Sequence, residues 1–179
     1  GYHWNILDSE DQYPVVFKSK ELPFPIVGMS NVMPYESTLY SSMTEEMIGS
    51  YREAFRRKLE KVKEEFNPDV IFAHHLWILT SLVREVFPDT KIIGICHNTD
   101  LRQAKMNPHL KYKYVDKIYE LDCVFSASER QKDEIVKVYD IDRNKIIAVG
   151  GGFNQNIFYP PEEKKYADKI RLVFCGKID

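Results

Sequence analysis

The clearest periodic pattern of the chain lies between residues 44 and 66. Apolar residues recur there at steps of three and four, which places them on one stripe of a helix. Ser42 with Glu45 forms a candidate capping box at the start, and Asn67-Pro68 is a stop signal at the end. We expect the opposite, charged face to be solvated, with its charges paired. The apolar stripe consists of Ile48, Tyr51, Phe55, Leu59, Val62 and Phe66.

After Pro68 the pattern changes to short apolar runs that alternate with longer segments. Continuous apolar runs are typical of buried parallel strands, and the segments between them have the length of helices. This alternation predicts right-handed βαβ crossovers and an α/β fold, a Rossmann-like parallel sheet with helices on both faces. The expected strands are residues 69–73, 91–96, 122–126 and 145–149, and the expected helices are residues 76–87, 108–120 and 128–139.

Residues 1–43 contain no long periodic element. Two short runs, residues 4–7 and 14–17, are candidate strands, and prolines then interrupt any longer regular structure. A segment this long without regular structure is uncommon inside a compact domain. We therefore expect residues 8–43 to be functional or to be anchored by their aromatic side chains.

Composition narrows the class of protein. The chain has 179 residues, of which 44% are hydrophobic and 29% charged, with a formal net charge of −2. These values exclude a disordered or collagen-like chain, and no apolar run approaches the roughly 20 residues of a membrane-spanning helix. Without a basic excess, we expect no nucleic-acid partner. The three cysteines lack CxxC spacing and lie in or beside apolar runs, which indicates buried thiols and a reducing, cytoplasmic location.

Polar residues, histidines or glycines follow each of the four expected strands. Ligands of parallel sheets bind beyond the carboxyl ends of the strands, so these positions together form the candidate site. They are His74-His75 and residues 97–100, 126–129 and 150–154. Because His74 and His75 are adjacent, an extended chain would point them to opposite sides, which disfavours joint binding of one metal ion.

Five segments carry motifs in a recognisable order. Residues 67–75 (NPDVIFAHH) are similar to a strand written PDhIhaH, and residues 96–100 (CHNTD) to a strand end written xHGxD. Residues 126–131 (SASERQ) are similar to vSexqk, residues 152–160 (GFNQNIFYP) to GvDxxxFxP, and residues 171–177 (RLVFCGK) to a strand that usually ends in Gly-Arg. In this order they resemble the group 1 glycosyltransferases, a large nucleotide-sugar-dependent family with the GT-B fold. The chain departs from the motifs at Asn98, Asn154 and Lys177, where the family usually has Gly, Asp and Arg.

The resemblance implies a division of the chain into parts. Residues 1–160 correspond to an incomplete N-terminal, acceptor-side domain that lacks the family's opening strand and glycine-rich loop. Residues 161–169 correspond to the interdomain linker, and residues 170–179 to the first strand of the C-terminal, donor-side domain. Because most of the donor pocket belongs to that second domain, we expect this fragment to be inactive alone.

The resemblance also implies a reaction and its residues. A sugar would move from a nucleotide-diphosphate sugar to an unidentified acceptor with retention of configuration, without a metal ion or other cofactor. His97 takes the place of the family's cleft histidine and is the expected catalytic residue, as a contact or orienting group. Lys177 takes the place of the phosphate-binding arginine, although lysine is a point charge and not a fork. The expected substrate-binding residues are His75, Asn98, Thr99, Asp100, Arg102, Glu129, Gly151, Gly152 and Asn154.

Several of these residues also have a structural interpretation. Asp100 can cap the segment that follows it, and Glu129 favours the dipole of the helix that it begins. Residues 150–152 can permit a sharp turn or form an anion-binding concavity. The basic, aromatic-rich stretch from Arg102 to Lys117 is expected to be a solvated face, with peripheral contact at the inner membrane face as the alternative.

Two other classes of function are open. A non-catalytic module would grip a glycan or an anion at the strand ends. A metal-dependent hydrolase would use His75, His97 and Asp100 as ligands. The ordered motifs favour the glycosyltransferase.

Overall fold

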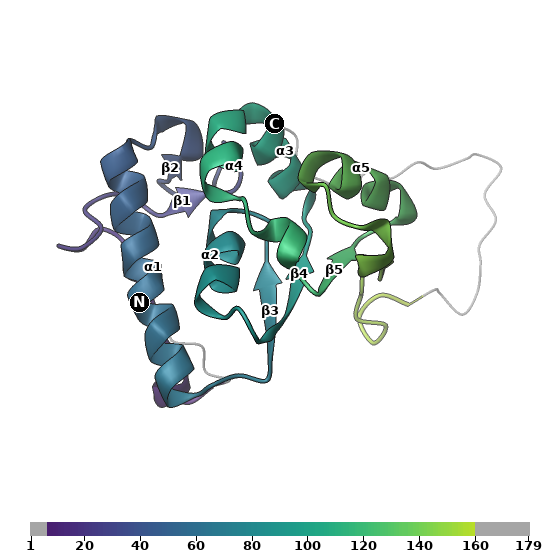
Figure 1. Ribbon diagram of the computed structural model, residues 1–179, viewed down its shortest axis with the longest axis horizontal. Coiled ribbons are helices and arrows are strands. Elements are labelled where there is room, and N and C mark those ends of the chain that lie inside the picture. The colour runs from purple at the N-terminus through teal and green to yellow at the C-terminus, as the bar shows by residue number, and fades with distance from the viewer. Residues whose placement is uncertain (1–6, 160–179) are drawn as a thin grey trace.

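The structure is a computed structural model that describes residues 7–159 (Figure 1). It confirms the predicted α/β class, because parallel strands alternate with helices along the chain after Pro68. Four strands pair in the order β3-β4-β5-β6, which is also their order in the sequence. Their bounds are Val70–His74 (β3), Lys91–Ile95 (β4), Cys123–Ser126 (β5) and Ile146–Ala148 (β6).

Five helices accompany this sheet in the described part of the chain. The register places Ala73 of β3, Gly94 of β4 and Val124 of β5 side by side, so all carboxyl ends lie at one edge. In Figure 1 this is the edge at which α3 begins. The helices are α1 (Glu45–Glu65), α2 (Ile78–Val86), α3 (Asn98–Met106), α4 (Pro108–Tyr114) and α5 (Glu129–Tyr139); short 3-10 turns are η1 (Ser9–Asp11), η2 (Tyr40–Ser42), η3 (Ile118–Glu120) and η4 (Arg143–Lys145).

Helix α1 forms where the periodicity predicts it, but its cap differs. The hydroxyl of Thr44 accepts the backbone N–H of Met47 at 3.2 Å, so Thr44 is the N-cap. The predicted capping box of Ser42 and Glu45 is wrong. Ser42 belongs to η2, and its hydroxyl donates to the carbonyl of Leu39 at 2.9 Å.

The predicted stripe of α1 faces the core. Ile48 and Tyr51 are buried, Phe55 packs against the core with partial burial, and Phe66 at the end is exposed. On the charged face, Arg57 pairs with Glu53 at 3.2 Å, as expected for a solvated helix face. Other charges connect helices, because Arg52 and Arg56 both pair with Glu85 of α2.

The structure corrects three other predictions of local structure. Residues 14–17 do not form a strand; Phe17 is instead an aromatic anchor, with its ring 6.0 Å from Phe24 and 6.2 Å from Tyr51. The expected helix 108–120 divides into α4 and η3, and α3 is a helix that the sequence pattern did not indicate. A small parallel pair, β1 (Val27–Gly28) and β2 (Thr38–Leu39), also forms, whereas the candidate strand at residues 4–7 falls largely outside the described residues.

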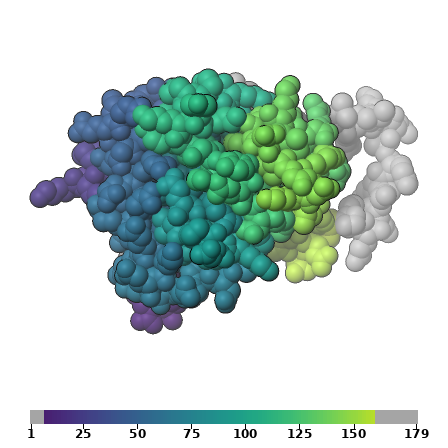
Figure 2. Space-filling view, in the orientation of Figure 1, coloured from purple at the N-terminus to yellow at the C-terminus, as the bar shows by residue number. Residues whose placement is uncertain are grey.

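The two faces of the four-stranded sheet differ. Ala73, Ile92 and Val124 are buried on the face against which α2 and α5 pack. On the other face, Phe72 is 58% exposed and Ile147 is 49% exposed. Within residues 7–159, the expected helical cover is therefore present on one face. Figure 2 shows the helices forming most of the surface visible from the side of Figure 1.

The cysteines and the helices also bear on predictions made from the sequence. Cys96 is buried and Cys123 half-buried, both as free thiols, while Cys175 lies outside the described residues. Burial, and then the negative charge of Asp100, raise the pKa of the Cys96 thiol, so it is uncharged at neutral pH. Among residues 7–159, no helix is both long and apolar enough to cross a bilayer.

Candidate functional site

The candidate site lies where β3 and β4 end and α3 begins. His74 is the last residue of β3 and pairs in register with Ile95, the last residue of β4. The chain leaves β4 through Cys96 and enters α3 with His97 as the N-cap. The topology therefore brings the two histidine-bearing strand ends together, as the parallel sheet predicted.

Asp100 organises this edge of the sheet. Its side chain is 0% exposed, and its Oδ2 accepts the backbone N–H of Leu76 at 2.9 Å and that of His97 at 2.8 Å. Its Oδ1 lies 2.7 Å from Nδ1 of His75. Asp100 takes part in capping, but it does not cap a following segment as predicted: it is the third residue of α3, and its side chain satisfies the N–H of the N-cap His97. The same carboxylate also fixes the end of β3.

The backbone conformation at His75 brings the side chains of His74 and His75 to the same neighbour, His97. Its φ of +68° is left-handed, so the chain is not extended there, and the expectation that His74 and His75 point to opposite sides is wrong. The ring of His75 lies 4.5 Å from that of His97, and the ring of His74 stacks on His97 at 5.4 Å. Nδ1 of His74 and Nε2 of His97 are 3.1 Å apart and share a hydrogen bond.

His97 is an uncharged imidazole at neutral pH. Partial burial is the main cause that lowers its pKa, the electrostatic effect of His75 is the next, and the negative charge of Asp100 only partly opposes them. Its ring nitrogen is bonded to His74, and it is partly exposed at the strand end. His97 is therefore suited to a hydrogen bond with an uncharged hydroxyl group.

A second link joins the ends of β4 and β5. Nε2 of Gln131 donates to Oδ1 of Asn98 at 2.7 Å, and its Oε1 accepts the N–H of Ala127 at 2.7 Å. Ser128, the N-cap of α5, accepts the N–H of Gln131 at 3.3 Å with its hydroxyl oxygen. Asn98 is thus held at the mouth of the site, and next to it the hydroxyl of Thr99 lies 3.4 Å from Oδ1 of Asp100.

Other predicted site residues do not contact this cluster. Glu129 is exposed and pairs with Lys132 at 2.9 Å and Arg143 at 3.5 Å, which agrees with its structural interpretation at the start of α5. Gly151 and Gly152 are exposed with open space around them. Oδ1 of Asn154 accepts the N–H of Asn156 at 2.9 Å in a local turn, and Lys177 lies outside the described residues.

The basic stretch of α3 and α4 is mostly paired. Lys105 pairs with Glu134 at 3.1 Å and Lys113 with Glu45 at 2.6 Å, which supports a solvated face. Arg102 is exposed and lines an open hollow of about 420 Å³ beside Asn98. This hollow adjoins the histidine cluster through Asn98 and places a cation next to it.

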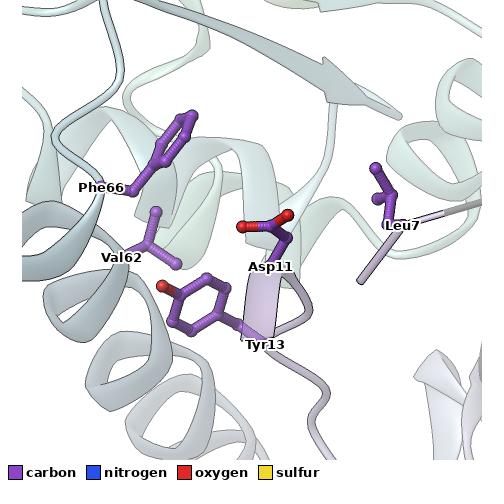
Figure 3. Close-up of a pocket in the computed structure, with 5 residues that line it drawn as sticks. All are labelled: Leu7, Asp11, Tyr13, Val62 and Phe66. Carbon is purple, nitrogen blue, oxygen red and sulfur yellow. The ribbon is translucent and has the colours of Figure 1, made fainter. Parts of the chain in front are cut away.

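A more apolar cavity of similar size lies elsewhere. It has a volume of about 410 Å³ and is formed by residues before α1 and by the end of α1 (Figure 3). The hydroxyl of Tyr13 donates to Glu65 at 3.1 Å at its margin. Because α1 ends just before β3 begins, this cavity is at the amino ends of the strands. Its walls are Leu7, Asp11, Tyr13, Val62 and Phe66, none of which belongs to the histidine cluster.

The hypothesised metal ligands are arranged differently from a metal site. No group of three or more His, Cys, Asp or Glu side chains within residues 7–159 is placed to hold a metal ion. His75 and Asp100, two of the three ligands that a hydrolase would need, are bonded to each other. This geometry favours a hydrogen-bonding site of histidine and carboxylate.

Sequence reasoning missed two residues that support the site. The hydroxyl of Tyr139, at the end of α5, donates to the carbonyl of Leu76 at 2.6 Å in the core. The ring of Tyr40, from η2, lies edge-on to Trp77 at 5.7 Å. Both tyrosines are distant in sequence from the strand ends, so no local pattern pointed to them.

Comparison with known proteins identifies the class of domain. The sequence model described as Glycosyltransferase Family 4 matches residues 44–156, which include the histidine cluster and its supporting helices. A search of curated proteins finds no match. The match agrees with the Rossmann-like fold and with the expectation of a glycosyltransferase-type domain. Because it covers more than half of the chain, the chain belongs to Glycosyltransferase Family 4.

Proposed function

We propose that this chain is the acceptor-side part of a glycosyltransferase that moves a sugar from a nucleotide-diphosphate sugar to an acceptor hydroxyl with retention of configuration. One observation carries the proposal: within the family match, the strand ends gather His75, His97 and Asp100 into one hydrogen-bonding cluster. Such convergent polar groups at the carboxyl edge of a parallel sheet are where a ligand is expected.

The chemistry of the proposed reaction suits this cluster. A sugar presents hydroxyl groups, each of which can donate and accept one hydrogen bond, and uncharged imidazoles can do both. The lowered pKa of His97 keeps it uncharged, so it can bind a sugar hydroxyl without first losing a proton. We propose His97 as this contact, with Asn98 and Arg102 at its side.

The negative charge that develops in the reaction lies on the departing diphosphate. Cations or oriented N–H groups must stabilise it, and such electrostatic stabilisation is usually the largest single contribution to catalysis. We propose that Lys177, in the sequence after the linker at residues 161–169, supplies one such charge from the donor-side domain. Activity then requires both domains, and residues 7–159 contribute the acceptor side.

The test is nucleoside-diphosphate release by the full-length product of the gene, assayed with a panel of nucleotide sugars in the presence and absence of a chelator. We expect turnover that resists the chelator. His97→Ala should lower kcat/KM by about 10- to 100-fold, the equivalent of about 1.4–2.8 kcal/mol, since a hydrogen bond to substrate is lost. His109→Ala is the matched control, because His109 is an exposed histidine of α4.

The outcomes separate the proposed function from the other classes. Release of diphosphate that falls in His97→Ala but not in His109→Ala supports the transferase. No release with any donor, together with binding of a glycan by the protein, contradicts it and favours a binding module. Activity that is abolished by the chelator contradicts the metal-independent reaction.

A further inference from the structure

We infer that the groove between α3 and α5 binds a phosphate ester group of the acceptor, with Asn98 and Arg102 as its hydrogen-bond donors. The inference rests on the proposed function and deepens it, because it assigns a chemical class to the acceptor. The phosphate in question belongs to the acceptor and not to the nucleotide sugar, whose diphosphate is proposed to meet Lys177 of the donor-side domain.

The groove consists of two neighbouring hollows along α3 and α5, which pack against each other (Figure 1). Each hollow has a volume of about 420 Å³, which is within the range of small-molecule pockets. Both have Lys105 and Glu134 among their walls, so they form one continuous groove that begins at Asn98. The lining residues are Asn98, Leu101, Arg102, Lys105, Met106, Glu134, Lys137 and Val138.

Hydrogen bonds determine which way the amide of Asn98 is turned. The backbone N–H of Ala127 can only donate, so the atom of Gln131 that meets it at 2.7 Å is the oxygen, Oε1. Nε2 of Gln131 therefore donates, and the atom of Asn98 that accepts it at 2.7 Å is Oδ1. Gln131 is only 6% exposed, so these bonds are shielded from water. The NH2 group of Asn98 is left without an acceptor in the described part of the chain, on a side chain that lines the groove.

Arg102 adds a charged donor to the same wall. It follows Asn98 by four residues, so both lie on one face of α3, about 6 Å apart along the helix axis. Its side chain is exposed and has no ion pair or hydrogen bond within residues 7–159. A guanidinium group presents its N–H donors in a fixed plane that matches the oxygens of a phosphate. Because the NH2 group and the guanidinium can only donate, their common ligand must offer acceptor oxygens.

The charges of the groove favour an anion. Its described walls carry three cations, Arg102, Lys105 and Lys137, and one anion, Glu134. Glu134 pairs with Lys105 at 3.1 Å, so the other two cations have no ion-pair partner among the described residues. The chain as a whole has a formal net charge of −2, so the positive groove is a local feature. An anion that enters it is attracted by charge as well as by hydrogen bonds.

The groove begins beside the residue that is proposed to bind the acceptor. Asn98 directly follows His97, the proposed contact of a sugar hydroxyl, so a small acceptor can meet both residues. The negative charge of Asp100 is directed elsewhere, because its carboxylate is 0% exposed and accepts the N–H groups of Leu76 and His97. The similar motif has Gly at the position of Asn98, and glycine has no side chain to donate. The phosphate site is therefore a property of this chain and does not follow from the motif.

Three substitutions in the full-length protein test the inference, with Lys91→Gln as the control. Arg102→Gln removes the charged donor. Asn98→Asp keeps an oxygen for the bond from Gln131 but replaces the NH2 group by a second oxygen of a carboxylate. Glu134→Gln removes the acidic residue that lines the groove. Lys91 is an exposed cation at the amino end of β4, so its replacement removes a positive charge at the opposite edge of the sheet.

The probes are inorganic phosphate and glucose 6-phosphate, with glucose as the neutral counterpart and uridine diphosphate as the donor-side counterpart. Binding is measured by calorimetry and by the ¹⁵N NMR signal of the Asn98 side-chain amide. Wild type should bind glucose 6-phosphate about 10-fold more tightly than glucose, and less tightly as the salt concentration rises. Arg102→Gln and Asn98→Asp should each weaken this binding by about 10-fold. Glu134→Gln should tighten it by about two- to fivefold, and Lys91→Gln should leave it unchanged.

The outcomes separate this inference from the proposed function. Equal affinity of wild type and Arg102→Gln for glucose 6-phosphate, or an Asn98 amide signal that neither phosphate probe shifts, overturns the phosphate site and leaves the proposed function standing. Binding of uridine diphosphate that weakens in Arg102→Gln assigns the groove to the donor and overturns its acceptor role. Absence of diphosphate release from every nucleotide sugar overturns the proposed function, and the acceptor role with it, even where the groove binds phosphate.

Discussion

Replacement of Arg84 by methionine is expected to destabilise the protein strongly without touching the site. Arg84 lies in α2 with only 6% of its surface exposed, and its Nη2 pairs with the carboxylate of Asp122. Its Nη1 fastens the loop between α2 and β4. The acceptors of Nη1 are the carbonyls of Phe87 at 3.3 Å, Pro88 at 2.9 Å and Thr90 at 3.1 Å.

The loss in free energy of unfolding depends on how many of the hydrogen-bond partners of Arg84 can bind water instead. A hydrogen bond to a charged group contributes about 1.5–3 kcal/mol, and removal of one partner of a buried ion pair typically costs about 3–5 kcal/mol. Pro88 is exposed, Thr90 is half-buried, and the side chain of Asp122 is 47% exposed, so water can reach part of the vacated space. Methionine also retains most of the apolar packing of the arginine stem. We therefore expect Arg84→Met to lose about 3 kcal/mol, the lower end of the range.

The assay is urea denaturation, followed by the fluorescence of the buried Trp77 and by circular dichroism. The control is Arg57→Met, because Arg57 is 54% exposed and pairs with Glu53 and Glu21 on the surface. Exposed pairs contribute about 0–1 kcal/mol, so this control should unfold near the wild-type midpoint. Equal midpoints for the two variants would refute the reasoning that burial of Arg84 decides its contribution.

Two further predictions concern glycine replacement and acid stability. Gly94→Ala should lower the free energy of unfolding by about 1–3 kcal/mol, because the added Cβ would lie 2.6 Å from Leu76 and 2.8 Å from Leu121. Gly49→Ala, in α1 with open space around it, should instead raise the free energy of unfolding by about 0.5–1 kcal/mol. Urea denaturation measures both changes and their opposite signs. Burial works to raise the pKa of Asp122, but the N–H of Ile92 and the guanidinium of Arg84 outweigh it and lower the pKa. The carboxylate therefore stabilises the fold above about pH 3.9, and this stabilisation is lost as the pH falls through the folded pKa. The difference in free energy of unfolding between wild type and Asp122→Asn should shrink between pH 6 and pH 3. A difference that stays constant would contradict this prediction.

Most of the sheet and of α1 follows from the sequence pattern. The apolar runs predicted all four strands of the main sheet, and the steps of three and four predicted α1, because burial on a defined face leaves a period in the sequence. Helix α3 was missed because it starts three residues after β4 and is capped by His97, which is not a usual capping residue. Residues 14–17 resemble a strand by composition, but long-range packing of Phe17 decides their conformation.

The candidate site was predictable to the level of strand ends and no further. Parallel topology alone brings His75, His97 and Asp100 to one edge of the sheet. The sign of φ at His75 depends on its hydrogen bonds to Ile95 and Trp77, so the sequence could not show that His74 and His75 face the same neighbour. The roles of His97 and Lys177 remain predictions.

Asp100 both stabilises the fold and orients a side chain of the candidate site, so a substitution at this position changes both. The same carboxylate caps α3 at the N–H of His97, holds the N–H of Leu76 after β3, and orients His75. Removing it with alanine would leave two buried N–H groups without a partner, and such groups cost about 1–3 kcal/mol each. Loss of activity in Asp100→Ala would therefore not distinguish an effect on the site from an effect on folding. Asp100→Asn keeps one oxygen for the two backbone N–H groups, while it removes the negative charge and turns an N–H group toward Nδ1 of His75, so it disturbs the fold less than alanine does and is the better variant for testing the site.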